Sequence, residues 1–330
     1  ANERLQAVLL GSNFLYGGVG EYTPLYVHAL SVNSYIESAW RFRQGGSQIT
    51  SLLLRELRAL GVELFAENKA LAFEYREGKI YSVITSQQQK YIATDFVSDI
   101  DIKQLLSIAG RTHFRPAYYK RIDALTPVAG VFSLHLVLKK QSFPYLPYNI
   151  YWHRDSSQVW QATHYTTDTF PTTYMLSMNP PKDGGAYADN MTILTYMNAQ
   201  ELSQWESTIH TLTAPQGRGV DYEVFKARKA QQLLEVVYQR FPKLKGCIVA
   251  QYTATPLTYR DYIGNPTGAI YGYEKNILRT RQNHIMPQTH IPNLYVTGQS
   301  VNMHGLVGVT IGAVLTSMAL LGGKIKGIGE

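Results

Sequence analysis

The residues whose types and spacing most clearly suggest a chemical role lie between positions 291 and 322. The apolar run Leu294-Tyr295-Val296 favours a strand, and Gly298-Gln299-Ser300 favours a turn after it. Gly305 and Gly308 continue a loop that leads into a second apolar run. Such a loop lets backbone N–H groups approach a ligand at the positive end of the helix dipole. The pattern predicts a ligand site, and tight packing of strand against helix is the ordinary alternative.

The helix after this loop has apolar residues all round rather than along one stripe. This distribution predicts burial on most of its faces. The uncharged part, residues 311–321, is too short to cross a bilayer.

Further elements are expected upstream. Residues 24–40 favour a helix, and Gly45-Gly46 favours a turn before a helix capped by Ser47. Residues 62–98 favour about four short strands with a hairpin turn at Glu77-Gly78. Strands are also expected at 128–139, 149–153 and 174–178. The longest amphipathic helix is predicted at 222–241, with its cations facing outward: Lys226, Arg228, Lys229 and Arg240. Outside this helix, Asp183, Asp189 and Asp261 are expected in loops without a paired partner.

Composition narrows the functional classes. The chain has 330 residues, is 45% hydrophobic and carries a net charge of +7, which describes a globular protein. The basic residues are scattered, so we expect no nucleic-acid partner, and we interpret the basic, aromatic stretch 111–123 as a solvated helix end. A single cysteine, Cys247, excludes an internal disulfide. The histidines show no metal-binding spacing.

Two stretches carry a family resemblance. GQSVNMHGLVG, at residues 298–308, and YTATPLTYRDYIGNPTGAIYG, at residues 252–272, occur in this order. Both resemble the phytoene desaturase-like FAD-dependent oxidoreductases, and Gln299 matches the retinol saturase branch of that family. The resemblance extends from Leu5 to Leu321.

The resemblance implies an α/β (mixed α+β) fold: a partial FAD/NAD(P)-binding, glutathione-reductase-like domain with an inserted mixed-sheet substrate domain. Residues 1–45 would be a helical lead-in, and residues 46–110 an FAD-domain segment with a β-meander. Residues 111–285 would form the substrate domain, and residues 286–330 the C-terminal FAD-domain segment.

The resemblance also implies site residues. Those expected at FAD are Gly45, Gly46, Ala70, Gly298, Gln299, Ser300, Gly305, Leu306, Val307, Gly308 and Val309. Tyr252 and Tyr271 are expected to line the substrate site. The implied chemistry is hydride transfer between flavin and a hydrophobic polyene or isoprenoid, with NAD(P)H as the candidate electron donor. Where a carbon must be protonated, His304 is the first candidate acid, and Tyr271 and Tyr252 are the other candidates. Gln299 carries no proton for this purpose and is expected to hydrogen-bond the cofactor.

One family element is missing from the sequence. A dinucleotide fingerprint needs a strand, three spaced glycines and a helix, whereas Gly18 and Gly20 follow a helical pattern without a third glycine. The chain is therefore expected to start after that unit, not to hold FAD tightly and to be inactive on its own.

Three alternatives stay open. A carotenoid or phytoene desaturase or isomerase would share the fold, and a non-catalytic protein that binds apolar ligands would have lost flavin. A flavin amine oxidase fits the two motifs less well. We expect a cytoplasmic location with peripheral membrane contact, and the sequence leaves the oligomeric state open.

Overall fold

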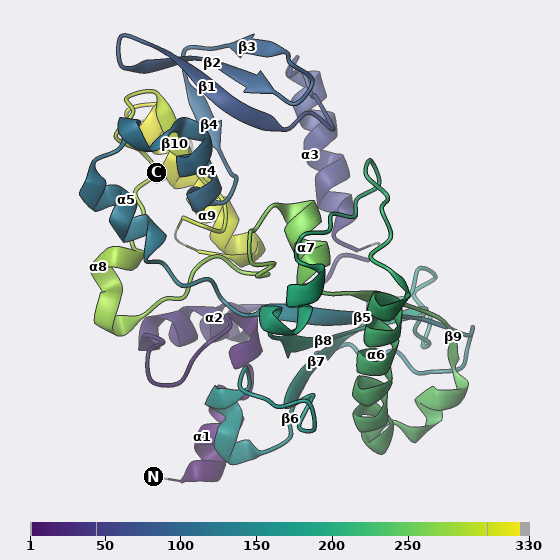
Figure 1. Cartoon of the computed structure of the whole chain (residues 1–330). Coiled ribbons are helices and arrows are strands. Elements are labelled where there is room, and N and C mark those ends of the chain that lie inside the picture. Colours follow the sequence, from purple (N-terminus) through teal and green to yellow (C-terminus); the bar gives the residue numbers. More distant parts are fainter. Residues whose placement is uncertain (1, 44, 302, 324–330) are drawn as a thin grey trace. The chain divides into compact units, whose positions relative to one another are not determined.

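A computed structural model describes residues 2–43, 45–301 and 303–323 (Figure 1). Helices and strands are interspersed along the chain, which confirms the predicted mixed α/β class. The chain forms two compact units, each gathered from three segments. Unit 1 contains Ala1–Glu21, Leu25–Leu64 and Ala129–Ile263; unit 2 contains Tyr22–Pro24, Phe65–Val128 and Gly264–Glu330. The domain boundaries expected from the sequence stay a prediction, and residues 324–330 of the expected last segment lie outside the described residues.

Unit 1 is built on an antiparallel five-stranded sheet of order β6-β7-β8-β5-β9 (Figure 1). Its strands are β5 (Gly130–Leu138), β6 (Ile150–His153), β7 (Thr173–Ser177), β8 (Asn190–Met197) and β9 (Ile248–Ala254). Strands predicted at 128–139, 149–153 and 174–178 are therefore confirmed. In the inner strand β5, Phe132, Leu134 and Leu136 alternate into the core.

Helix α6 (Val220–Arg240) packs against this sheet. Ala230, Leu233 and Val237 share one hydrophobic core with the strands. The prediction that Lys229 points outward is wrong, because 1% of its side chain is exposed and its Nζ lies 2.6 Å from Glu201 Oε2. The ammonium group also lies 4.1 Å from the centre of the Phe170 ring. An anion and an aromatic face thus compensate the buried charge.

The remaining helices of unit 1 are α1 (Glu3–Leu10), α2 (Leu25–Glu37), α3 (Ser47–Ala59) and α7 (Pro256–Ile263), with 3₁₀ turns η1 (Asn13–Leu15), η3 (Ser156–Gln161), η4 (Ala199–Trp205) and η5 (Pro242–Gly246). Gly46 rather than Ser47 occupies the cap position of α3. Asp261 was expected unpaired in a loop, which is wrong. It lies on α7 and forms ion pairs with Arg218 and Arg260. Arg218 is distant from Asp261 in the sequence, and the fold brings the two side chains together.

Unit 2 contains a meander and a pair of parallel strands (Figure 1). The meander consists of β1 (Ala70–Arg76), β2 (Lys79–Thr85) and β3 (Lys90–Ile92), and β4 (Phe96–Ser98) pairs in parallel with β10 (Leu294–Val296). The predicted hairpin turn is confirmed: Glu77 and Gly78 have φ of 48° and 76°, as a type I′ turn requires. The four strands predicted between 62 and 98 are present, the first beginning at Ala70.

One buried side chain joins the meander to the parallel pair. Asn293 Oδ1 accepts from Ile80 N at 3.0 Å, and its Nδ2 donates to the carbonyl oxygens of Ile80 and Thr94, each at 2.8 Å. Its own carbonyl accepts from Phe96 N at 2.9 Å. Asn293 therefore satisfies backbone groups that neither sheet pairs.

The helices of unit 2 are α4 (Ile102–Ala109), α5 (Pro116–Asp123), α8 (Thr280–Asn283) and α9 (Gly305–Leu320), with 3₁₀ turns η2 (Arg111–His113) and η6 (Ile277–Arg279). Leu105, Ile122 and Leu294 share a second hydrophobic core. The prediction that α9 is buried on most faces is wrong: among the described residues only Gly308 and Thr316 of this helix are buried. Thr316 Oγ1 donates to Val296 O at 3.0 Å, so α9 touches β10 along one side.

Candidate flavin half-site and apolar cavity

The predicted glycine loop begins where β4 and β10 end, in unit 2. Thr297 N donates to Ser98 O at 2.9 Å, which extends the parallel pairing by one residue. Gly298 has φ of +84°, and a Cβ there would lie 3.1 Å from Asp99 O. A side chain at this position would be strained both by its conformation and by contact. The loop therefore leaves from the carboxyl ends of parallel strands, where such sheets usually bind ligands.

The N-terminus of α9 is the second part of this loop. Gly308 packs on the loop so closely that a Cβ would lie 2.7 Å from Met303 Cβ. Gly305, Leu306 and Val307 are exposed, and Val307 is 64% exposed. Within the described chain, the N-cap residue His304 makes no side-chain capping hydrogen bond. The first-turn N–H groups and the positive dipole end can therefore receive an electron-rich group.

A second predicted segment crosses this loop. A Cβ on Gly272 would lie 3.1 Å from Ser300 Cα and closer still to Gln299 O. This contact brings the Tyr271 and His304 rings together, with their centroids 4.2 Å apart and their planes at 30°. The structure thus brings together two residues that the sequence predicted separately for the substrate and for proton transfer.

The crossing segment is fixed to the start of α4. Tyr273 Oη donates to Asp101 Oδ2 at 2.7 Å, while Asp101 Oδ1 accepts from Lys103 N at 3.0 Å and Gln104 N at 3.2 Å. Burial, with the adjacent Asp101 carboxylate, raises the pKa of Tyr273 far above its ordinary value. Tyr273 therefore stays protonated and donates to the capping carboxylate.

The loop also shows an unsatisfied polar atom. Thr297 Oγ1 is buried and has no hydrogen-bond partner among the described residues. FAD carries carbonyl, hydroxyl and phosphate oxygens, which suit both this hydroxyl and the helix N-terminus. The donors of the described residues 297–301 and 303–309 therefore fit an oxygen-rich part of such a cofactor.

The other predicted site residues are placed as follows. Ala70 begins β1 in unit 2 and is half-buried. Gly45 and Gly46 belong to unit 1, where they line a cavity of about 740 Å³. Tyr252 also belongs to unit 1, on the edge strand β9, and is 65% exposed. Its role at a substrate site stays a prediction.

The cavity of unit 1 contains functional candidates that the sequence did not indicate. Its described lining is mixed. It includes six aromatic residues and two methionines, namely Tyr35, Trp40, Phe42, Tyr145, Tyr148, Tyr151, Met175 and Met178, beside the polar residues Ser12, Arg41, Asn149, Ser177 and Asn179. Arg41 and Asn149 are the polar residues at its wall that bond one another, with Arg41 Nη2 donating to Asn149 Oδ1 at 2.5 Å. No local pattern could reveal this pair, because its members come from segments far apart in sequence.

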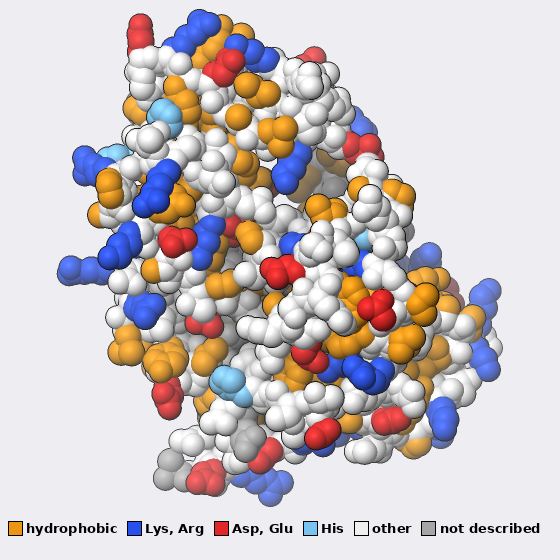
Figure 2. Space-filling model, in the orientation of Figure 1, with side chains coloured by type: hydrophobic (Ala, Val, Ile, Leu, Met, Phe, Trp, Pro, Cys, Tyr) orange, Lys and Arg blue, Asp and Glu red, His pale blue; other side chains and the backbone are white. Residues whose placement is uncertain are grey.

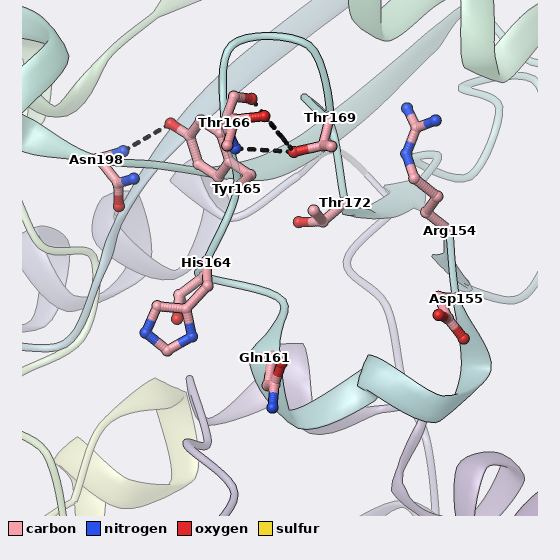
Figure 3. Close-up of a pocket in the computed structure, with 10 residues that line it drawn as sticks. Arg154, Asp155, Gln161, His164, Tyr165, Thr166, Thr169, Thr172 and Asn198 are labelled. Atoms are coloured by element: carbon pink, nitrogen blue, oxygen red, sulfur yellow. Dashed lines mark hydrogen bonds between the residues drawn. The ribbon is translucent and has the colours of Figure 1, made fainter.

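A second, polar cavity of about 450 Å³ lies elsewhere in unit 1 (Figure 3). Several of its lining side chains bond to backbone groups: Thr169 Oγ1 accepts from Thr166 N at 2.8 Å, and Tyr165 Oη accepts from Asn198 N at 2.8 Å. Arg154 and His164 at its rim are exposed. Like the cavity of about 740 Å³, this cavity is open to solvent rather than enclosed.

The basic, aromatic stretch 111–123 is largely self-paired in unit 2. The guanidinium of Arg111 lies 4.6 Å from the Tyr119 ring centre, and that of Arg121 lies 5.1 Å from the Tyr118 ring centre. Figure 2 shows basic and acidic side chains interspersed on the visible face. These pairings suit a folded surface, as the sequence suggested.

The described residues hold no cluster of three or more His, Cys, Asp or Glu that could bind a metal ion. In the same part of the chain, no helix is long and apolar enough to cross a membrane.

Comparison with solved structures shows the class of fold. The fold is that of the FAD-dependent oxidoreductases. The solved structure of a putrescine oxidase A394C mutant, from a redesign of cofactor binding, matches 86% of this chain and 54% of its own, with a TM-score of 0.54 and 10% identity. No family model matches the sequence.

By sequence, the chain is similar to all-trans-retinol 13,14-reductase. The protein of that name from Rattus norvegicus is 26% identical over 97% of this chain and 56% of its own length. The one from Homo sapiens is also 26% identical, over 97% and 55%. The resemblance predicted from the two motifs is confirmed, and the chain spans about half the length of these curated relatives.

Proposed function

We propose that the protein is an FAD-dependent oxidoreductase acting on carbon–carbon double bonds of a hydrophobic polyene or isoprenoid. One observation carries the proposal: in the stretch that resembles the saturase branch, the described residues 298–301 and 303–304 follow a parallel strand, and residues 305–308 form the open first turn of α9. The relatives named all-trans-retinol 13,14-reductase support saturation as the direction. Desaturation and isomerisation of a polyene would use the same loop.

In this proposal, residues from Thr297 to Val309 hold an oxygen-rich part of FAD, which supplies hydride chemistry when bound. Saturation adds a hydride to one carbon and a proton to the other. His304 is the proposed proton donor, oriented by its contact with the Tyr271 ring. NAD(P)H is the proposed source of electrons.

Two further features belong to the proposal. The sequence contains no strand–GxGxxG–helix unit for the pyrophosphate, so this chain should bind FAD weakly. We also place the activity in the cytoplasm at a membrane surface, where an apolar substrate dissolves.

The test uses this chain with excess dithionite-reduced FAD and a conjugated polyene, under anaerobic conditions. Loss of polyene absorbance reports saturation, and the fluorescence of oxidised FAD, titrated in a separate sample without dithionite, reports cofactor binding. We expect Gly305→Val to weaken FAD binding and His304→Gln to slow turnover at saturating FAD by roughly 10²–10⁴-fold. Gly312→Ala, on the same helix, is the matched control. Unaltered FAD binding in Gly305→Val would contradict the assignment of the loop.

A second candidate is a non-catalytic protein that binds apolar ligands, which the 740 Å³ cavity of unit 1 favours. Polyene binding that persists without any FAD-dependent change in absorbance, at saturating FAD, would support this candidate and reject the oxidoreductase.

A further inference from the structure

Among the described residues that line the 740 Å³ cavity of unit 1, one side chain is charged. This cavity volume lies in the range of sites for small organic ligands. The lining residues that the structure describes include four tyrosines, one tryptophan, one phenylalanine and two methionines, but no aspartate or glutamate. Arg41 is the one charged residue among them.

Arg41 is held in place by neutral acceptors. Its Nη1 donates to Met178 O, and its Nη2 donates to Asn149 Oδ1 at 2.5 Å. No carboxylate forms an ion pair with it among the described residues. A guanidinium has five N–H donors, so these two bonds leave capacity for a further acceptor.

Neighbouring groups extend this polar end of the cavity. Asn149 Nδ2 donates to Tyr151 Oη at 3.4 Å, and the Arg41 charge acts on the Tyr151 hydroxyl. Burial, as the main cause, raises the pKa of Tyr151 to about 12, so this hydroxyl is protonated at neutral pH. The polar end therefore offers a cation and a hydroxyl donor, beside a wall that suits a hydrocarbon.

We propose that this cavity binds an elongated apolar molecule with a terminal carboxylate, and that Arg41 is the counter-ion of that carboxylate. Charge favours this pairing. The half-buried Arg41 guanidinium has neutral neighbours, so an anion would stabilise it most, and the two oxygens of a carboxylate match two parallel N–H donors of a guanidinium. An alcohol or ester would leave the charge uncompensated. The proposal deepens the proposed function by naming the substrate class, and it rests on that function only in treating the bound molecule as a substrate.

The test uses parinaric acid, a fluorescent conjugated tetraene fatty acid, and its methyl ester, with the unaltered chain and without FAD. We expect the acid to bind about 10- to 100-fold more tightly than the ester, as a charge-assisted pair of hydrogen bonds predicts. Arg41→Gln should abolish this preference, whereas Arg41→Lys should keep part of it. Arg43→Gln removes an exposed charge two residues away and should leave both affinities unchanged.

Asn149→Asp provides an independent variant. It keeps the acceptor that Arg41 uses but adds a carboxylate, so it should weaken binding of the acid and spare the ester. Equal affinity for acid and ester in the unaltered chain, or an acid preference that survives in Arg41→Gln, would overturn the proposal. These outcomes require no flavin, so a failure of FAD-dependent turnover would reject the proposed function while leaving this result intact.

Discussion

Two glycines of α9 differ sharply in their surroundings. A Cβ at Gly308 would lie 2.7 Å from Met303 Cβ and 3.0 Å from Met303 C, whereas at Gly312 no described atom would lie within 4 Å. We expect Gly308→Ala to lower the free energy of unfolding by about 1–3 kcal/mol, because the loop must move. Gly312→Ala should raise it by about 0.5–1 kcal/mol through helix propensity. Urea denaturation measures both, and equal effects would contradict the close packing of loop and helix.

The Arg218–Asp261 pair is almost completely buried, with 4% and 2% of the two side chains exposed. Asp261 Oδ2 also accepts from His210 N at 2.8 Å. Asp261→Asn should cost about 3–5 kcal/mol of stability, because it leaves the Arg218 charge buried without an anion. Asp189→Asn, at an exposed position, should change stability by less than about 0.5 kcal/mol. A small effect at Asp261 would mean that water reaches Arg218.

At the level of elements, a histidine links the end of α1 to β6. His153 Nε2 donates to Gly11 O at 2.8 Å. Burial lowers the pKa of His153 despite that hydrogen bond. Its unfolded-state pKa is about 6.5, so the unfolded chain takes up a proton first and stability falls as the pH drops below about 6.5.

The pH dependence can be assigned to this link by substitution. His153→Gln can still donate to Gly11 O but does not titrate, so the loss of stability between about pH 6.5 and 5 should become smaller. His135, whose pKa burial also lowers, accounts for part of the remaining slope. Denaturation at several pH values gives the comparison, and an unchanged slope in His153→Gln would contradict it.

Local elements could be predicted from the sequence, whereas long-range partners could not. The Glu77-Gly78 turn and the order of strand, glycine loop and helix at 294–320 depend on neighbouring residues, which the sequence displays. The outward orientation predicted for Lys229 was wrong because Glu201 and Phe170, which compensate its buried charge, lie outside α6. The contact between Tyr271 and His304 likewise depends on a chain crossing that no local pattern encodes.

At the level of the whole molecule, each unit has its own hydrophobic core. The core of unit 2 comes only from the segments on either side of residues 129–263. At the boundary, Val128 N donates to Gly272 O at 3.2 Å, and Pro127 pairs with Tyr273. The chain therefore leaves unit 2 beside a segment of the same unit.

We expect residues 65–128, joined to residues 264–323 by a short Gly-Ser linker, to fold cooperatively, since core and boundary contacts are all retained. Circular dichroism during thermal unfolding should show a single sigmoidal transition. The same chain with Leu105→Asp, which places a charge in that core, should show none. A featureless profile for both chains would mean that this core needs the other segments.

The Asn293 side chain has a consequence for hydrogen–deuterium exchange. The Ile80 amide is bonded to a side chain rather than to a strand, and such amides usually exchange through small local fluctuations. Here the same carboxamide also holds Ile80 O and Thr94 O, so freeing this amide requires breaking several bonds together. The Ile80 amide should therefore exchange as slowly as that of Leu294 in β10, and Asn293→Ala should release it selectively. The meander and the last strand would then open as one cooperative element.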